Sequence, residues 1–178
     1  SMGHTLEGTL TLNGAAMDFT GGTGYVETDR GRSFPSAYLR TQCAWRETRC
    51  SSLMLSIADI PLAAGSFTGC ICAVLHQGRE YRLATYQGAR VERWSGGGAL
   101  IRQGRYRLEA EVLEGRGHPL RAPVEGGMGR IIYERLSAKV RYRFWKENAL
   151  LFEHTDAHAS FEFAEQAYRP DASAVWSD

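Results

Sequence analysis

The chain has 178 residues, 43% of them hydrophobic, and its 21 Lys and Arg against 20 Asp and Glu give a formal net charge of +1. This length fits one domain, which buries about 70% of the surface that its unfolded chain exposes. The even charge balance argues against nucleic acid or an anionic membrane surface as a partner. No apolar run approaches the ~20 residues of a membrane-spanning helix. We therefore predict a single domain over residues 1–168 and a loose tail over residues 169–178.

Alternation of apolar and polar residues predicts antiparallel strands along most of the chain. The pattern is cleanest in Tyr106–Val112 and Ala138–Phe144, where apolar and charged side chains take turns. Turn signals such as Asn13-Gly14, Gln77-Gly78 and Gln103-Gly104 separate the predicted strands. Less regular strands are predicted, in chain order, at residues 6–12, 38–45, 53–60, 69–75, 79–85, 90–94, 129–136 and 150–154.

The number of strands constrains the fold class. About eight to ten antiparallel strands must close or stack to protect their edges, as a barrel or as a sandwich. Because hairpin signals recur at regular intervals, we predict an all-β fold, an antiparallel up-and-down barrel of the lipocalin-like kind. The cluster Gly96-Gly97-Gly98 predicts a hairpin tip and not a phosphate loop, since no helical pattern follows it.

Cysteines and histidines give no signal for a disulfide, a metal site or a cofactor. Cys70 and Cys72 would point to the same face of one strand, with their backbones too far apart for an easy bridge. No Cys-x-x-Cys or paired Cys/His spacing occurs. His154 and His158 could meet at a barrel mouth, but lone histidines on strands are more often surface residues. We therefore predict buried, reduced thiols, no metal, no cofactor and a cytoplasmic location.

One segment, Gly22 to Pro35, reads GTGYVETDRGRSFP and combines two carboxylates, two arginines and three glycines. It resembles the signature of the tocopherol cyclase family, in which Gly-Tyr-x-Glu-x-Asp-Trp-Gly leads into Phe-Pro. The family's Trp is Arg30 here, and the Asn expected two residues after Gln42 is Ala44. The matching residues are Gly24, Tyr25, Glu27, Asp29, Gly31, Phe34 and Pro35, followed in the same order by Gln42, residues 56–61, residues 84–89, and residues 120–123 ahead of Gly127-Met128.

The resemblance covers roughly residues 6–163 and implies a fold and a chemistry. Members of this family, and the similar carotenoid hydratases, usually have two lipocalin-like halves, and this chain resembles the second half alone. Their reaction protonates an electron-rich alkene, so it needs a carboxylic acid that stays protonated in an apolar pocket. Asp29 is the predicted general acid. Glu27, two residues away on the same strand face, is its predicted partner.

A structural explanation of the same residues stands beside the catalytic one. Glu27 and Asp29 could pair with arginines and fix the loop that ends in Phe-Pro. Arg30, in place of an aromatic ring that could stabilise a carbocation, also weakens the case for cyclisation.

Aromatic side chains are more numerous than the inside of a tightly filled small barrel can hold. A ligand-holding interior or a partner interface would account for the surplus. Tyr86 could offer its hydroxyl to a ligand, or it could be a buried tyrosine with a backbone partner. The residues predicted to line a ligand are Tyr25, Phe34, Gln42, Tyr86 and Met128.

The sequence thus predicts a domain that binds a hydrophobic prenylated or aromatic small molecule. Acid-triggered cyclisation or hydration of an alkene is the enzymatic form of this hypothesis. The alternative is a non-enzymatic carrier of apolar ligands or an interaction module. A homodimer, or a partner that covers the face of the missing half, would then hide an exposed apolar patch.

Overall fold

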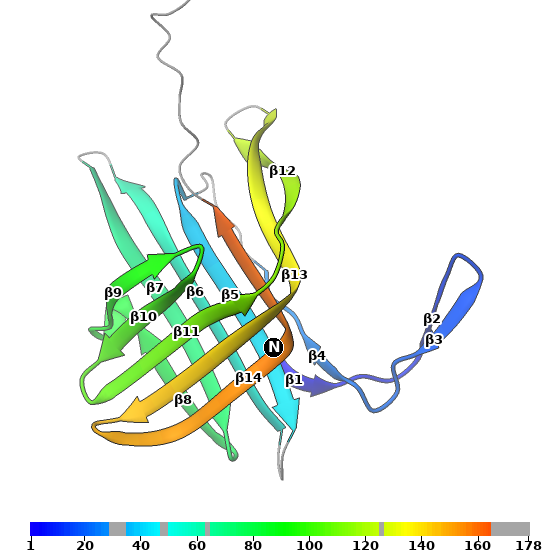
Figure 1. Ribbon diagram of the computed structural model, residues 1–178, viewed down its shortest axis with the longest axis horizontal. Helices are drawn as coiled ribbons and strands as arrows, with labels where there is room; N and C mark the ends of the chain where they lie inside the picture. Colours follow the sequence, from blue (N-terminus) through cyan, green and yellow to red (C-terminus); the bar gives the residue numbers. More distant parts are fainter. Residues whose placement is uncertain (29–34, 47–49, 63–64, 125–126, 165–178) are drawn as a thin grey trace, which may run out of the picture.

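The computed structural model describes residues 1–28, 35–46, 50–62, 65–124 and 127–164 (Figure 1). Within these residues the regular structure is almost entirely β, which confirms the predicted all-β class. The elements are β1 (Met2–Thr5), β2 (Thr9–Leu12), β3 (Ala15–Asp18), β4 (Thr23–Tyr25), β5 (Tyr38–Arg46), β6 (Cys50–Leu62), β7 (Gly65–His76), β8 (Arg79–Ala84), the 3₁₀ turn η1 (Thr85–Gln87), β9 (Arg90–Ser95), β10 (Gly98–Gln103), β11 (Tyr106–Glu114), β12 (His118–Val124), β13 (Gly127–Lys146) and β14 (Ala149–Ala164).

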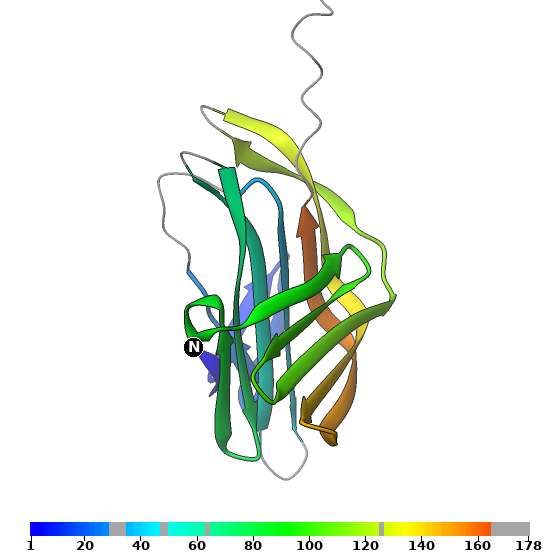
Figure 2. The same ribbon diagram turned by 90° about the vertical axis from the view of Figure 1, so that its left-hand side faces the viewer.

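Ten strands form one antiparallel sheet in the order β8-β7-β6-β5-β14-β13-β11-β10-β9, with β12 paired to β13 beside this path. Most strands lie next to their neighbours in the chain, as the hairpin signals predict. The exceptions are the ladder between β11 and β13, which follows after β12 in the chain, and the ladder between β5 and β14, which runs from Tyr38 opposite Ala164 to Gln42 opposite Ser160. Figure 2 shows the sheet curling so that its two ends approach each other.

The two ends of this sheet are β8 and β9, which η1 connects. The backbone N–H of Ala89 donates to the carbonyl of Ala84 at 2.9 Å. No β8–β9 ladder is found within the described strands, whose pairing path starts at β8 and stops at β9. The antiparallel meander is therefore confirmed, while a closed lipocalin-like barrel stays a prediction.

Tight turns follow the predicted signals. Asn13 and Gln77 have φ angles of 50° and 51°, and each precedes a glycine with positive φ, as two-residue hairpins require. Gly98 closes the β9–β10 hairpin with φ +139°, and a Cβ there would lie only 2.1 Å from the carbonyl oxygen of Ala110. The glycine cluster is therefore a hairpin tip, as predicted. One boundary prediction was wrong, because the two strands expected at residues 129–136 and 138–144 form the single strand β13.

The core lies on the inner face of the curled sheet. Burying each of its larger apolar side chains contributes about 1.5–3 kcal/mol. Phe144 packs against Tyr81, Tyr106 and Phe152 at ring-centroid distances of 5.2, 5.8 and 5.7 Å, so part of the aromatic surplus fills this interior. The fully buried larger side chains are Leu39, Leu53, Leu55, Ile57, Val74, Leu83, Ile101, Leu108, Val140, Tyr142, Phe144 and Phe161.

The cysteines agree with the predicted reduced thiols. All four are free, and Cys43, Cys70 and Cys72 are buried among the core residues. Burial is the main reason that the pKa values of Cys70 and Cys72 are raised. These thiols therefore pack as small apolar groups.

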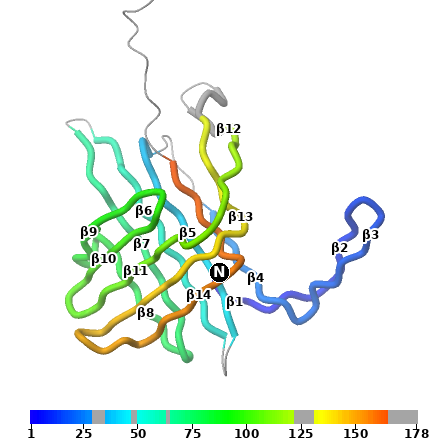
Figure 3. Tube along the Cα trace, viewed as in Figure 1, coloured from blue at the N-terminus to red at the C-terminus, as the bar shows by residue number. Residues whose placement is uncertain are grey.

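The first strands lie outside the ten-stranded sheet. β1 pairs with β4, and β1 contacts β6. The β2–β3 hairpin extends away from the rest of the molecule, as the blue segment of Figures 1 and 3 shows, and all its residues are exposed. In the described part of the chain, no helix has the length and apolar character needed to cross a membrane.

Candidate functional site

Three of the predicted site residues, Tyr25, Glu27 and Gln42, lie on the outer face of the sheet. In β5, Leu39, Thr41 and Cys43 are buried on the inner face, so Arg40 and Gln42 point to the opposite side. Tyr25 and Glu27 approach this outer side through their contacts with Arg40. Tyr25, Glu27 and Gln42 therefore do not line the interior of the sheet, where a barrel ligand was expected.

Tyr25, Glu27 and Arg40 form one cluster on that face. The Tyr25 hydroxyl donates to Oε2 of Glu27, and Nη2 of Arg40 lies 2.6 Å from the same oxygen. Burial first, and then the Glu27 carboxylate, raises the pKa of Tyr25 to about 12. The cluster matches the structural explanation of Glu27 as the partner of an arginine, and that arginine is Arg40.

A second acid and phenol lie on the same face, close to this cluster. Glu162 of β14 is directly opposite Arg40 in the β5–β14 ladder. It accepts a hydrogen bond from the hydroxyl of Tyr38, two residues before Arg40 on β5. The outer end of this ladder thus presents phenols, carboxylates and a guanidinium side by side.

Three of the predicted residues cannot be placed in this way. Asp29 and Phe34 lie outside the described residues, so the predicted general acid stays a prediction. Met128 belongs to β13, but its side chain is outside what the structure describes.

Tyr86 is the predicted ligand residue that lines a pocket. Its side chain is 68% exposed, so the alternative of a buried tyrosine is wrong. It lies in η1 at a groove of about 370 Å³ on the outer face of β6 and β7. The groove is lined by Ser56, Ala58 and Ile60 of β6, Phe67, Gly69, Cys70 and Ile71 of β7, and Thr85 and Tyr86 of η1.

The strand pattern explains why this groove is open and apolar. Its β6 residues alternate with Leu55 and Ile57, which are buried on the inner face. Ala58 lies directly opposite Gly69, so two small residues share the floor. The backbone N–H of Cys70 donates to Oγ1 of Thr85 at 2.7 Å, which holds η1 at the groove.

Cross-strand register joins the charged cluster to the groove. Arg40 is directly opposite Ser56, and Ser56 is directly opposite Ile71. Directly opposite side chains on one face lie about 5 Å apart at Cβ. Arg40 therefore lies on the strand next to Ser56, which lines the groove. Gln42 occupies the next outward-facing position along β5. An apolar surface with a polar group beside it suits an amphiphilic ligand.

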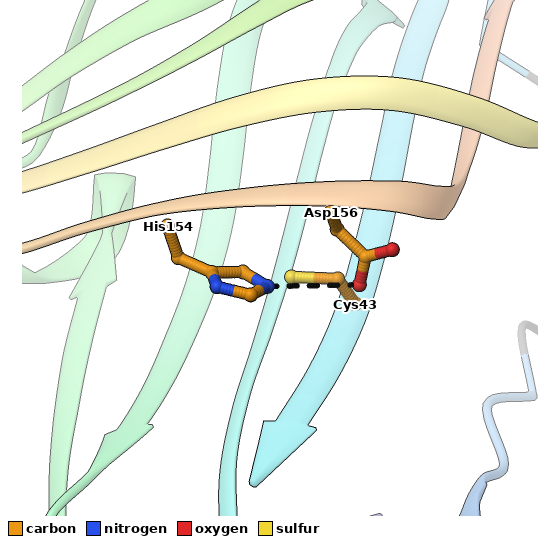
Figure 4. Close-up of side chains that lie close together, drawn as sticks. All are labelled: Cys43, His154 and Asp156. Atoms are coloured by element: carbon orange, nitrogen blue, oxygen red, sulfur yellow. Dashed lines mark ion pairs between the residues drawn. The ribbon is translucent and has the colours of Figure 1, made fainter. Parts of the chain in front are cut away.

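A separate cluster of Cys43, His154 and Asp156 lies where β5 and β14 part (Figure 4). Their possible ligand atoms all lie within 4.8 Å of one another. Burial, followed by the nearby Asp156 carboxylate, raises the pKa of the Cys43 thiol. The pKa of Asp156 is lowered, first by its interaction with the nearby His154 side chain.

Sequence reasoning did not single out this cluster. His154 was weighed with His158, but His158 is exposed and its Nδ1 lies 2.8 Å from the hydroxyl of Ser137. The spacing of His154 and Asp156, two residues apart on one strand, was the available local signal. Cys43 comes from a distant strand, and no local pattern connects it to them.

No family model, curated protein or solved structure matches this chain. The fold and the outer face define an all-β antiparallel protein with an apolar groove beside a charged cluster. The resemblance to the tocopherol cyclase family stays a prediction.

Proposed function

We propose that this protein binds an apolar, ring-bearing small molecule with a polar head in the groove on the outer face of β6 and β7. The observation that carries this proposal is the groove itself, about 370 Å³ in volume with aromatic and aliphatic walls. Small-molecule sites typically span about 300–1,000 Å³, and a few polar groups orient the ligand in an apolar pocket.

The lining suggests how such a ligand lies. Phe67 and Tyr86 offer ring faces and edges for aromatic contacts, which contribute about 0.5–1.5 kcal/mol beyond area burial. The polar head would point to Ser56 and, across the next strand, to Arg40. A phenol or quinol suits this end, because its hydroxyl can donate to a carboxylate and accept from a guanidinium.

Binding is better supported than acid catalysis. An acid-triggered cyclisation or hydration would need a protonated carboxyl group that faces the ligand. Glu27 accepts hydrogen bonds from Tyr25 and pairs with Arg40, so in this structure it serves as an acceptor. The enzymatic form of the proposal therefore depends on Asp29, and we propose the carrier form first.

We extend the proposal to the scaffold and its setting. The meander order and the approach of β8 to β9 support a lipocalin-like barrel, similar to one half of a tocopherol cyclase. The four free cysteines support a cytoplasmic setting, where thiols stay reduced.

The exposed Ile71 and Phe67 also support the second candidate, an interaction module that pairs with a second copy or a covering domain.

The proposal is tested by titrating the full chain with a prenylated quinol and following protein fluorescence. We expect saturable binding near one site per chain. Tyr86→Ala should weaken binding by about 10-fold, a loss equivalent to about 1.4 kcal/mol. Tyr133→Ala is the matched control, because Tyr133 is similarly exposed but lies on β13, away from the groove.

Two outcomes would reject the small-molecule proposal. One is the lack of saturable binding; the other is an equal loss of affinity in the Tyr86 and Tyr133 variants. Native mass spectrometry of the same samples separates the second candidate. A dimer that Ile71→Asp dissociates, in a protein that binds no quinol, would assign the groove to an interface.

A further inference from the structure

We propose that Cys43, His154 and Asp156 bind a divalent transition-metal ion, with zinc the best match (Figure 4). Thiolate, imidazole and carboxylate together form a zinc-type ligand set. Zinc bonds of about 2.0–2.3 Å in tetrahedral geometry place ligand atoms roughly 3.3–3.7 Å apart. Nε2 of His154 and Oδ2 of Asp156 are already 3.8 Å apart, and no pair exceeds 4.8 Å. Side-chain movements of about 1 Å would close the site.

The end of a strand ladder brings these residues together. β5 and β14 pair only from Tyr38–Gln42 against Ser160–Ala164. Cys43 is the next residue of β5 and points inward. His154 and Asp156 lie two residues apart on β14, before the register shift against β13 that follows Asp156. The side chains therefore meet in the wedge between two strands that have stopped pairing, which Figure 4 shows in close-up.

His154 has a buried ring nitrogen, without a hydrogen bond, that faces the other two ligands. Its Nε2 is buried and makes no hydrogen bond with any described residue, since the 3.8 Å ion-pair contact with Oδ2 of Asp156 is too long for one. A buried polar atom without a partner costs about 1–3 kcal/mol, so a favourable interaction at this atom is to be expected. A metal ion would supply that interaction.

Neighbouring groups already orient the ligands, as the surroundings of metal sites usually do. The indole of Trp45 stacks on the His154 ring with a centroid distance of 4.4 Å and an interplanar angle of 10°. The backbone N–H of His158 donates to Oδ1 of Asp156 at 2.7 Å, which leaves Oδ2 directed to His154. The ring and the carboxylate are thus both held in position.

Cys43 also has a polar neighbour. Its side chain interacts with that of Tyr142, whose hydroxyl lies 2.5 Å from Oγ1 of Thr41. When the metal binds, the S–H bond breaks, the sulfur donates its electron pair to the metal, and the proton leaves to solvent. Zinc binding by this site therefore releases one proton from the thiol for each metal bound.

The cluster lies close to the surface. The side chains of His154 and Asp156 are 21% and 16% exposed, while Nε2 of His154 and the Cys43 side chain are buried. Three protein ligands leave one position for water or a small anionic ligand, which is the pattern of catalytic rather than structural zinc.

The same three residue types could instead form a nucleophile relay, but the geometry disfavours it. In such a relay the thiol and the carboxylate use opposite nitrogens of the imidazole ring. Here Asp156 faces Nε2, and Figure 4 shows the Cys43 sulfur beside the same contact. All three groups converge on one point, which suits a shared cation.

The test uses the full chain, titrated with zinc by calorimetry and with cobalt(II) by absorbance. We expect one metal per chain, a thiolate charge-transfer band with cobalt, and a pH-dependent proton release. Cys43→Ser should remove the band. Zinc binding should weaken by at least about 10-fold in each of Cys43→Ser, His154→Gln and Asp156→Asn. Even substitutions of residues that only contact a metal ligand typically cost this much affinity.

Matched controls come from β6, the neighbour of β5, and from β14. Cys50→Ser removes a half-buried free thiol of β6, and His158→Gln removes an exposed imidazole of β14; both should keep full affinity. If Cys43→Ser does not fold by circular dichroism, His154→Gln decides. The proposal is overturned if the wild type shows no thiolate band, or if the folded ligand variants bind zinc as tightly as the controls. The site is on the inner side of the sheet, so its result is independent of quinol binding at the outer groove.

Discussion

The two faces of the sheet at β5–β8 are built from alternating residues of the same strands, but they differ in burial and in the sites that they carry. The inner face is packed without exposure at Leu55, Ile57 and Val74. The outer face keeps Ile71 half exposed and carries both the groove and the Tyr25–Glu27–Arg40 cluster. An antiparallel sheet with one dry face can leave its other face free to vary. Substitutions of inward-facing residues should therefore reduce stability, and substitutions of outward-facing residues on the same strands should reduce ligand binding.

The largest expected effect comes from an isoleucine pair on opposite faces. Ile57→Ala should cost about 2–5 kcal/mol, because it opens a cavity in the core. Ile71→Ala, on the neighbouring strand, should change stability by less than about 1 kcal/mol, since half of this side chain is already exposed. Urea unfolding of both variants measures the difference.

Ligand binding should show the reverse order for this pair. Ile71→Ala removes part of the groove wall and should weaken ligand binding. Ile57→Ala leaves the groove residues unchanged, so the folded fraction of this variant should bind normally. A variant Ile71→Ala that loses as much stability as Ile57→Ala would mean that the outer face is covered in solution. In that case the separation of the two faces is wrong.

A smaller effect is expected at the outer cluster. Glu27→Gln leaves Arg40 without its ionic partner in a partly buried position, so we expect a loss of about 1 kcal/mol, between exposed and buried pairs. Glu80→Gln, in the exposed pair with Arg82, is the control and should leave the denaturation midpoint unchanged. Equal midpoints for Glu27→Gln and wild type would show that the cluster does not anchor the N-terminal segment.

The smallest effect is a pH dependence from Tyr25. Its pKa is about 12 in the folded protein against the ordinary value of 10.0. The unfolded chain therefore loses this proton first, and the contribution of Tyr25 to stability is full below about pH 10 and is lost as pH rises towards 12. Thermal melts of wild type and Tyr25→Phe across this range should converge with rising pH. Parallel curves would contradict the shift.

The alternation of apolar and polar residues predicted the positions of the strands well, but it predicted poorly which side of a strand faces the core. Residues 106–112 and 138–144 alternate cleanly, and both lie in strands as expected. In β5, however, Thr41 and Cys43 are buried while Arg40 and Gln42 are not, and small polar residues do not reveal which parity faces the core. Gln42 lies on the outer face because it occupies an outward position of β5, and Tyr25 and Glu27 lie there because they contact the outward-facing Arg40.

The metal-type cluster lay beyond local pattern for a different reason. It depends on where the β5–β14 ladder ends, which is a pairing between the first and last long strands of the sheet. Periodicity in either strand says nothing about that end point. Only the three-dimensional register brings Cys43 to His154 and Asp156.

Gln103, at the end of β10, gives the sheet a property that its strand order alone would not. Its side-chain amide donates to the carbonyl of Arg82 and accepts from the N–H of Ala84, so it occupies backbone groups on the free edge of β8. An edge strand with open backbone groups invites strand addition from another chain. Gln103 therefore protects the edge of β8 from pairing with strands of other molecules. It does so where β8 and β9, the two ends of the sheet, form no ladder with each other.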